Sequence, residues 1–287
     1  MRNQFDTIVI GGGIFGQVIA AQLRSMGVDL AIFDARFEDA GSKPAACLMK
    51  PSWFSSMGRQ KYDPALNLLD RLYGLHSINF KTGPISHNVY WISPHLILKP
   101  AIEESQPVIE KAVVKFRYNL SEMGHQITTG DGSEYFAKRV IVAAGVWSNN
   151  FVKDFEVNPV PGLQGKKGAA FLWRQEEIDQ PFISPWAPFK QIVAFNRGDG
   201  LWAGDGSAIL AKNWTDERLA KSRLRCAGAV NQFPSDSIAL VGQRPYAQTG
   251  DPCYIKRFGT ITIVTGGAKN GTIAAGWAAN QLTMSLG

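Results

Sequence analysis

Four glycines stand at the start of a stretch that otherwise has the pattern of an amphipathic helix, in the hexapeptide GGGIFG. Gly11, Gly13 and Gly16 fit the spacing G-x-G-x-x-G. In this pattern the first glycine permits a tight turn, the second lets the backbone approach a pyrophosphate, and the third lets a helix pack closely on a strand. The free N–H groups at the start of the following helix attract phosphate oxygens. The spacing therefore predicts phosphate binding by the backbone.

A carboxylate follows at the distance that a dinucleotide site needs. Asp34 ends the apolar run LAIFD, 18 residues past Gly16, and is placed to accept hydrogen bonds from a ribose. The glycine pattern alone also occurs in ordinary turns. The complete set of strand, glycine turn, helix, second strand and carboxylate favours dinucleotide binding.

The apolar pattern indicates the elements that position these groups. The run TIVI, residues 7–10, is rich in β-branched side chains and is typical of a buried parallel strand. The stretch after the glycines has helical spacing and ends at Gly27. Two later runs, 140–144 and 261–264, also lead into glycines, and we expect them to join the first strand in one sheet. The Asp-Gly pair at 131–132 predicts a hairpin turn before the second run.

Composition sets the class of molecule. A chain of 287 residues with 45% hydrophobic and 19% charged residues is expected to be globular, with one large or two modest domains. No apolar run approaches the roughly 18 residues of a membrane span, and the first residues lack the pattern of a signal peptide. We therefore predict a cytoplasmic protein that makes no membrane contact.

Cysteines and histidines give no sign of a metal or nucleophilic site. The three cysteines and four histidines are scattered and include no C-x-x-C pair. An odd number of separated cysteines suits a reducing compartment. We expect no bound metal.

Four motifs together resemble the D-amino acid oxidase and glycine oxidase (DAO) family of FAD-dependent oxidoreductases. They are IVIGGGIFG, VIVAAGVWS, GDG within GLWAGDGSAIL, and GQRPYAQTGDPCYI followed by TGGAKNGTIAAG. The resemblance covers nearly the whole chain and implies FAD as the cofactor. It also implies an α/β fold, in which a Rossmann-like FAD-binding domain carries a smaller α+β substrate domain with an antiparallel sheet.

The expected domains are discontinuous. Residues 1–58, 100–152 and 241–287 are assigned to the FAD-binding domain, and residues 59–99 and 153–240 to the substrate domain. Members of the family usually run some tens of residues longer, so the substrate domain is expected to be shortened.

The resemblance assigns the glycine motif to the adenosine pyrophosphate and the C-terminal turn to the isoalloxazine ring. Backbone N–H groups of residues 269–272 would face the flavin pyrimidine, where negative charge develops on reduction. The small residues of the stretch SKPAAC fit close approach to the ring. The expected cofactor-binding residues are Gly11, Gly13, Ile14, Phe15, Gly16, Asp34, Ala35, Arg36, Ala45, Ala46, Ala144, Gly145, Trp147, Gly267, Lys269, Asn270, Gly271 and Thr272.

Three side chains are candidates for catalysis. Arg244, in GQRP, matches the position whose guanidinium grips the substrate carboxylate in this family; the alternative is a structural arginine. Lys269 could stabilise reduced flavin or help oxygen accept electrons, or could equally point to solvent. Tyr90, next to Trp91 on an expected strand, could wall the cavity, although such residues are more often core. Cys47 is expected to be an inert buried thiol and not a flavin tether.

The net charge of +6 lies in two segments, 59–99 and 241–287, which carry five basic against two acidic and four basic against one acidic residue. The second segment contains Arg244. This distribution favours an anionic substrate over nucleic acid, because no basic run or RNA-binding motif accompanies it.

The sequence predicts FAD-dependent oxidation of an amine, either an amino acid or an amino-acid-like group, to an imine by hydride transfer to flavin N5. Oxygen or another acceptor would reoxidise the flavin. Two alternatives stay open: a flavin monooxygenase or modifying enzyme acting on an amine or aromatic group of a macromolecule, and a non-catalytic FAD-binding partner protein. The oligomeric state is left open.

Overall fold

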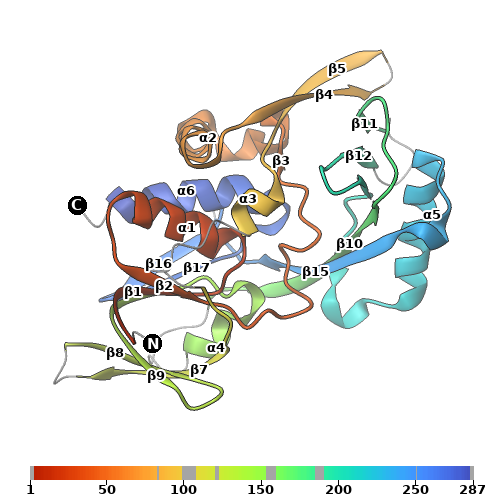
Figure 1. Cartoon of the computed structure of the whole chain (residues 1–287). Coiled ribbons are helices and arrows are strands. Elements are labelled where there is room, and N and C mark those ends of the chain that lie inside the picture. Colours follow the sequence, from red (N-terminus) through yellow and green to blue (C-terminus); the bar gives the residue numbers. More distant parts are fainter. Residues whose placement is uncertain are drawn as a thin grey trace.

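The first sheet is built on the apolar runs that the sequence singles out. In the computed structural model, strands β1 (Gln4–Ile10), β9 (Glu134–Val142) and β17 (Ile261–Thr265) come from distant parts of the chain and lie side by side and parallel, in the order β17-β9-β1 (Figure 1). Every residue of β17 is buried, as expected for a parallel strand covered on both faces. The prediction that these runs share one sheet is confirmed.

The structure describes residues 3–82, 84–98, 108–119, 123–152, 160–184, 191–249 and 251–284. Among them, no helix is long and apolar enough to cross a membrane.

Further strands extend this first sheet. β2 (Leu30–Phe33) and β6 (Val108–Ile109) continue it in parallel beyond β1, and β16 (Tyr254–Phe258) pairs antiparallel with β17 at the opposite edge. The stretch β1, helix, β2 is therefore the βαβ unit that the glycine pattern predicts. The carboxyl ends of its strands meet at one edge, where ligands bind in open α/β sheets.

An antiparallel meander leaves the sheet at β9. β8 (Gly124–Thr129) pairs with β9, and β7 (Val113–Asn119) pairs with β8. The connection from β8 to β9 runs through Asp131 and Gly132, with the Asp131 carboxylate accepting hydrogen bonds from Thr129 Oγ1 and the Ser133 N–H. The predicted hairpin is confirmed.

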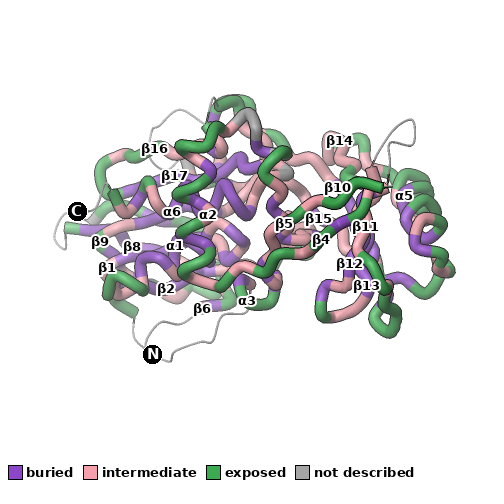
Figure 2. The backbone as a smooth tube through the Cα atoms, turned by 90° about the horizontal axis from the view of Figure 1, so that it is seen from above, coloured by how far each residue is buried: buried purple, intermediate pink, exposed green. Residues whose placement is uncertain are grey.

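Helices cover one face of the first sheet. α1 (Ile14–Ser25) and α6 (Gly271–Met284) contact each other and the sheet, and α2 (Arg59–Tyr73) packs across α6. α6 is apolar nearly all round because it lies between the sheet and α2. Figure 2 shows the buried residues gathered around α1 and α6.

The second sheet is mixed but mostly antiparallel, with the order β14-β10-β13-β12-β11-β4-β5-β3 and with β15 paired to the other side of β10. The long strands β10 and β15 connect the two sheets (Figure 1). The remaining bounds in this sheet are β3 Leu48–Met49, β4 His76–Thr82, β5 Ile85–Trp91, β10 Gln164–Trp173, β11 Phe182–Ile183, β12 Val193–Asn196, β13 Leu201–Gly204, β14 Ile209–Leu210 and β15 Ile238–Tyr246.

The two faces of the second sheet have different partners. Residues such as Phe171 and Trp173 of β10 pack with Cys226 and Val230 of helix α5 (Asp216–Val230). Their neighbours along the strands, which include Leu172, pack on the opposite face. The apolar runs GAAFLW, NVYW and VAFN lie in β10, β5 and β12, and α5 starts after its N-cap Thr215.

Short elements complete the described chain. They are the α-helices α3 Pro94–Leu98 and α4 Asn149–Val152, and the 3₁₀ turns η1 Pro51–Met57, η2 Gly145–Trp147, η4 Ala211–Asn213, η5 Pro234–Asp236 and η6 Ala268–Asn270.

The expected fold class, a Rossmann-like unit joined to a second sheet, is confirmed. The domain limits stay a prediction, and two packing facts bear on them. α2 packs mainly on α6 and α1, and β15 runs continuously across residue 241 and pairs along its length with β10. We propose Gly74 and the end of β15, at Tyr246, as the limits in place of residues 59 and 241.

Candidate functional site

The glycine turn between β1 and α1 leaves no room for side chains. Gly11 has φ +107°, and a Cβ there would lie 2.5 Å from the Ala143 carbonyl oxygen. A Cβ on Gly16 would overlap the Gly11 carbonyl oxygen. A Cβ on Gly12 would lie 2.6 Å from the Asp34 carboxylate, so this glycine, which the motif leaves undefined, lets the carboxylate lie against the turn.

The N-terminus of α1 is open toward a ligand. Its N-cap, Gly13, has no capping side chain, and the first turn carries no acidic residue. The Ile14 N–H donates to Ser42 Oγ at 3.0 Å, and a Cβ on Gly13 would lie 3.0 Å from the same oxygen. A helix end whose own N-cap supplies no side chain, and where Ser42 takes only the Ile14 N–H, fits a pyrophosphate.

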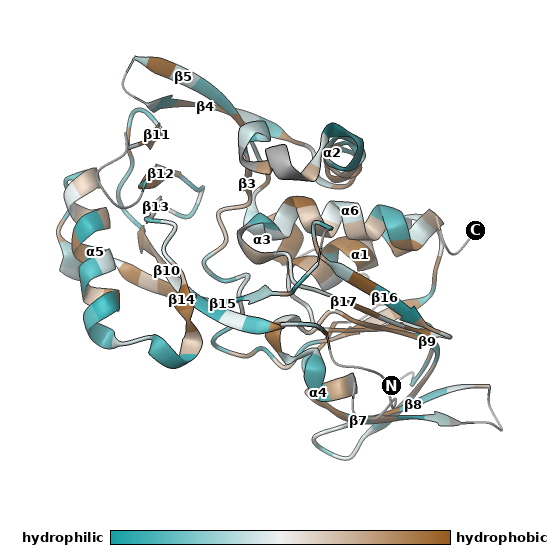
Figure 3. Cartoon of the chain, turned by 180° about the vertical axis from the view of Figure 1, so that it is seen from behind, coloured by the Kyte–Doolittle hydropathy of each residue, from teal (hydrophilic) through white to brown (hydrophobic). Residues whose placement is uncertain are grey.

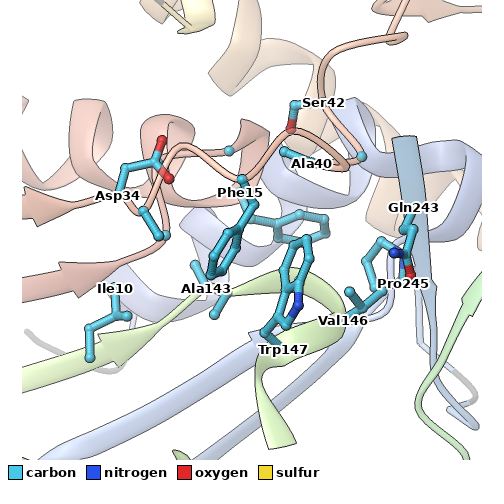
Figure 4. A pocket seen from close by; sticks show the side chains of 18 of the residues that line it. Ile10, Phe15, Asp34, Ala40, Ser42, Ala143, Val146, Trp147, Gln243 and Pro245 are labelled. Carbon is cyan, nitrogen blue, oxygen red and sulfur yellow. The ribbon is translucent and has the colours of Figure 1, made fainter. Parts of the chain in front are cut away.

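A cavity of about 380 Å³ adjoins this turn. Figure 4 shows Asp34 at one end and Gln243 with Pro245 at the other, with the rings of Phe15 and Trp147 between them. Trp147 packs against Phe37, with ring centroids 4.7 Å apart. The cavity brings together these predicted residues: Gly11, Gly13, Ile14, Phe15, Asp34, Ala35, Ala144, Gly145, Trp147, Gly267 and Gly271.

Asp34 and Arg36 differ in their roles. The Asp34 carboxylate lies at the end of β2 on the cavity wall and accepts a hydrogen bond from the Arg36 backbone N–H at 3.2 Å. The Arg36 guanidinium pairs with Glu110 at 2.7 Å and is not among the lining residues. Gly16 does not line the cavity either. It lets α1 pack closely on the backbone of the glycine turn.

A second cavity of about 410 Å³ shares Ile14, Gly41, Arg244, Ala268 and Gly271 with the first. The two cavities are therefore neighbouring parts of one site. The second lies between the start of α6 and the loop before β3 on one side and the second sheet on the other. The predicted residues on its wall are Ala45, Ala46, Asn270, Gly271 and Thr272.

The start of α6 departs from the prediction in one detail. The Asn270 N–H donates to the Gly267 carbonyl at 2.9 Å, so it is not free to face a ring. Gly271 begins the helix, and its positive dipole end points at the second cavity. The Lys269 side chain lies outside the described part of the structure.

Arg244 is the unpaired cation of this site. It lines both cavities, and its side chain makes no hydrogen bond or ion pair with any described residue. Burial lowers the pKa of its guanidinium, with a partly opposing effect of Tyr246 and Asp205. Nη2 lies beside Gly168 on the neighbouring strand: a Cβ there would be in ordinary contact with it at 3.6 Å, but would clash with the Ser207 carbonyl oxygen at 2.6 Å. An unpaired, largely desolvated guanidinium favours an anionic ligand.

The nearest buried acid cannot serve as that anion. Asp205, in the GDG turn, is fully buried and is bonded by Arg225 and by Ser222 Oγ at 2.9 Å. Its opposing hydrogen bonds outweigh burial and lower the pKa of its carboxyl. The GDG segment, residues 204–206, lies at the end of β13 and in the connection to β14.

Tyr90 and Cys47 are also singled out by the sequence, as a cavity wall and as an inert thiol. Tyr90, in β5, pairs with Met49 of β3 and packs against the core that contains α1 and α6. It is not among the residues that line either cavity. Its neighbour Trp91 donates from Nε1 to the Ala46 carbonyl at 3.0 Å and so fixes the loop beside the site. Cys47 lines the second cavity, and burial raises the pKa of its thiol to about 11.

Sequence reasoning missed residues that reach the site only through tertiary contacts. Ser42 and Gly41 sit in the loop after β2, which meets β15 through a bridge between Ala40 and Gln243. A Cβ on Gly41 would overlap the Gln243 carbonyl oxygen. The run GSK before PAAC is the only sequence signal for this approach.

No family model matches the sequence. Three solved structures have the same fold over nearly the whole chain. They are a glycine oxidase from Geobacillus kaustophilus (15% identical, 99% of this chain and 94% of that chain, TM-score 0.69), a glycine oxidase from Bacillus cereus (18% identical, 98% and 96%, TM-score 0.67) and the dithionite-reduced L-α-glycerophosphate oxidase from Mycoplasma pneumoniae with FAD bound (13% identical, 99% and 94%, TM-score 0.68). The fold implied by the four motifs is confirmed.

Proposed function

We propose that this chain is an FAD-dependent oxidoreductase of the DAO family, and that it oxidises an amine carrying a negative charge. The fold and the four sequence motifs support the family. The open start of α1, the carboxylate of Asp34 and the two joined cavities support FAD.

The residues present fit this cofactor. The backbone around Gly13 would hold the pyrophosphate, and Asp34 would accept hydrogen bonds from the ribose. The second cavity, at the start of α6, would take the isoalloxazine, because a helix N-terminus favours negative charge on its pyrimidine side. FAD supplies a hydride acceptor at N5.

Arg244 carries the proposal about the substrate. Its guanidinium is largely buried, unpaired among the described residues and present in the wall of both cavities. A guanidinium offers two parallel N–H donors to one carboxylate, which fixes the substrate in one orientation. Orientation is the main contribution that a protein makes to hydride transfer from a neutral amine.

Two side chains in the lining of the second cavity, Cys47 and Asp205, are not free to act as a nucleophile or a base. Cys47 is a neutral thiol below a pH of about 11, and Asp205 is engaged by Arg225 and Ser222. Neither residue is available as a nucleophile or base. The proposed residues therefore bind and orient the substrate.

An anionic alcohol is a second candidate substrate, because one structure with this fold is an L-α-glycerophosphate oxidase and a guanidinium binds phosphate as well as carboxylate. The same residues would then orient a C–O bond in place of a C–N bond.

The test is anaerobic loss of flavin absorbance in the FAD-loaded protein. Glycine, sarcosine, both enantiomers of larger amino acids, L-glycerol 3-phosphate and NADPH are compared. Reduction by an amino acid with formation of an imine-derived carbonyl product supports the proposal. Reduction by glycerol phosphate alone supports the second candidate, and reduction by NADPH alone supports a monooxygenase and contradicts both.

A further inference from the structure

The loop after β2 is bonded to the second sheet through one carboxylate. Asp39 Oδ2 accepts hydrogen bonds from Lys167 Nζ of β10 at 3.0 Å and from Gln243 Nε2 of β15 at 3.2 Å. The Gln243 backbone N–H donates to the Asp39 carbonyl at 2.8 Å. Lys167 and Gln243 are partners in the register of the two strands. A single loop residue therefore makes three bonds to two neighbouring strands.

The Asp39–Lys167 pair is charged and partly shielded from water. The side chain of Lys167 is 21% exposed and that of Asp39 is 40% exposed. The hydrogen bond from Lys167 lowers the pKa of the Asp39 carboxyl, so the carboxylate is ionised at neutral pH. A charge-assisted hydrogen bond is stronger than a neutral one, and partial exposure to water weakens it.

The pair holds the loop against the outer edge of β15. β10 and β15 run side by side (Figure 3), and β15 also forms isolated bridges to Ala40 and to Gly267. A Cβ on Gly41 would overlap the Gln243 carbonyl oxygen and would lie 3.5 Å from the Arg244 Cα. The loop therefore packs directly on the backbone of the strand that carries Arg244.

The same loop lines the proposed cofactor site. Ala40, Gly41 and Ser42 line the first cavity, and Gly41 lines both cavities. Ser42 Oγ accepts a hydrogen bond from the Ile14 N–H at the start of α1. Figure 4 shows Ala40 and Ser42 on the side of the cavity opposite Trp147. A cofactor that fills both cavities therefore passes along residues 40–42.

We propose that Asp39 and Lys167 are positioning residues for FAD. Their ion pair keeps residues 40–42 on β15, closed over the middle of the cofactor, and it breaks before FAD leaves. The inference rests on the proposed function, in which FAD spans both cavities. Neither Asp39 nor Lys167 lines a cavity, so both act on the cofactor through the loop.

The test measures how fast FAD leaves the reconstituted protein. The loaded protein is diluted into flavin-free buffer, and released flavin is separated by filtration and quantified at intervals. Asp39→Asn keeps the shape of the side chain and removes its charge, and is expected to release FAD about three- to tenfold faster. Lys167→Met is expected to have the same effect, whereas Lys167→Arg keeps a charged donor and is expected to release FAD near the wild-type rate.

The double variant shows whether the two residues act through one contact. Asp39→Asn combined with Lys167→Met is expected to release FAD no faster than the faster single variant, because either change alone already breaks the pair. A double variant whose acceleration is the product of the two single accelerations would overturn the role of the ion pair.

Asp251→Asn is the matched control. It breaks the Lys61–Asp251 ion pair, which joins two distant segments at 2.6 Å with side chains 38% and 51% exposed, and neither residue lines a cavity. Its rate of FAD release is expected to equal that of the wild type. The melting temperature of each apoprotein is recorded alongside, and Asp39→Asn and Asp251→Asn are expected to lower it by similar amounts.

The remaining outcomes separate this inference from the proposed function. If the wild type binds FAD and Asp39→Asn releases it at the wild-type rate, the positioning role is wrong while cofactor binding stands. Equal acceleration by Asp39→Asn and Asp251→Asn also overturns the positioning role, because it reports a general loss of stability. If the wild type takes up no FAD, the proposed function is wrong, and the inference falls with it.

Discussion

At the scale of single residues, Arg244 has the largest predicted effect. Replacing it with alanine removes both donors from an anion in a partly desolvated cavity, which costs about 2 to 5 kcal/mol for a buried charge pair. We expect kcat/KM for the best anionic substrate to fall by roughly 30-fold to several thousand-fold. Arg244→Lys is expected to restore only part of this, because an ammonium cannot form two parallel bonds.

The measurement is anaerobic flavin reduction, with bound FAD quantified alongside. FAD content is expected to stay near that of the wild type in both variants, since Arg244 belongs to β15 and is not part of the glycine turn. Reduction of Arg244→Ala at the wild-type rate would show that the substrate carries no anion at this position.

Cys47 gives a prediction about alkaline pH. Burial raises the pKa of its thiol from 9.0 to about 11, so the folded state holds this proton while the unfolded chain releases it. The folded-state stabilisation is complete below about pH 9 and is lost as pH rises toward 11, by at most about 2 to 3 kcal/mol. We expect the melting temperature to fall over this range, and Cys47→Ala to reduce that fall.

Cys226 supplies a comparison for this measurement. Burial raises the pKa of its thiol to about 12, so it contributes to the same alkaline loss from the opposite side of the second sheet. Cys47→Ala should therefore reduce the pH slope without abolishing it. An unchanged slope would mean that the Cys47 thiol ionises as freely in the folded protein as in the unfolded chain.

At the scale of elements, the turn between β1 and α1 carries the predicted cofactor binding. Gly13→Val puts a branched side chain against Ser42 Oγ, since even its Cβ would lie only 3.0 Å from that oxygen, and fills the approach of the pyrophosphate. We expect the purified variant to be colourless while the wild type is yellow, with far-ultraviolet circular dichroism showing that both are folded.

Gly228→Ala is the matched control within another helix. Gly228 lies inside α5, and a Cβ there meets no atom within 4 Å. The change is expected to stabilise the protein by roughly 0.5 to 1 kcal/mol and to leave its FAD content unchanged. If the Gly13→Val protein binds FAD as the wild type does, the pyrophosphate does not bind at this turn.

At the scale of the whole molecule, the site depends on both sheets. Arg244 comes from β15, which pairs in the second sheet, while Gly13 and Gly271 begin the helices on the first. A ligand that contacts both sheets stabilises them together. FAD at a hundred times its Kd is expected to add about 2.7 kcal/mol to the stability, which a thermal scan records as a rise of several degrees in one transition.

A scan with two separate transitions, of which only one shifts with FAD, would contradict this coupling. The comparison uses the apoprotein and the reconstituted protein at the same concentration. A change confined to one transition would indicate that FAD stabilises only one of the two sheets.

The sequence by itself determined what depends on local order. The spacing of Gly11, Gly13 and Gly16 forms a turn because each glycine acts within a few residues of its neighbours, and the apolar runs of β1, β9 and β17 form parallel strands because each is buried on both faces. Arg244 could be singled out because its motif resembles a family pattern. These features depend on few contacts between residues that are far apart in the sequence.

Only the tertiary structure decided which distant residues meet. Ser42 reaches the start of α1, and Trp202 shares a cavity with Arg244, through strand pairings whose register no local pattern encodes. The same pairings leave Tyr90 away from the cavity lining and place α2 on α6. A shift of one residue in a strand moves each side chain to the opposite face of a sheet. Cavity walls and cores are therefore assigned by the packing of whole sheets, which is settled only when the chain has folded.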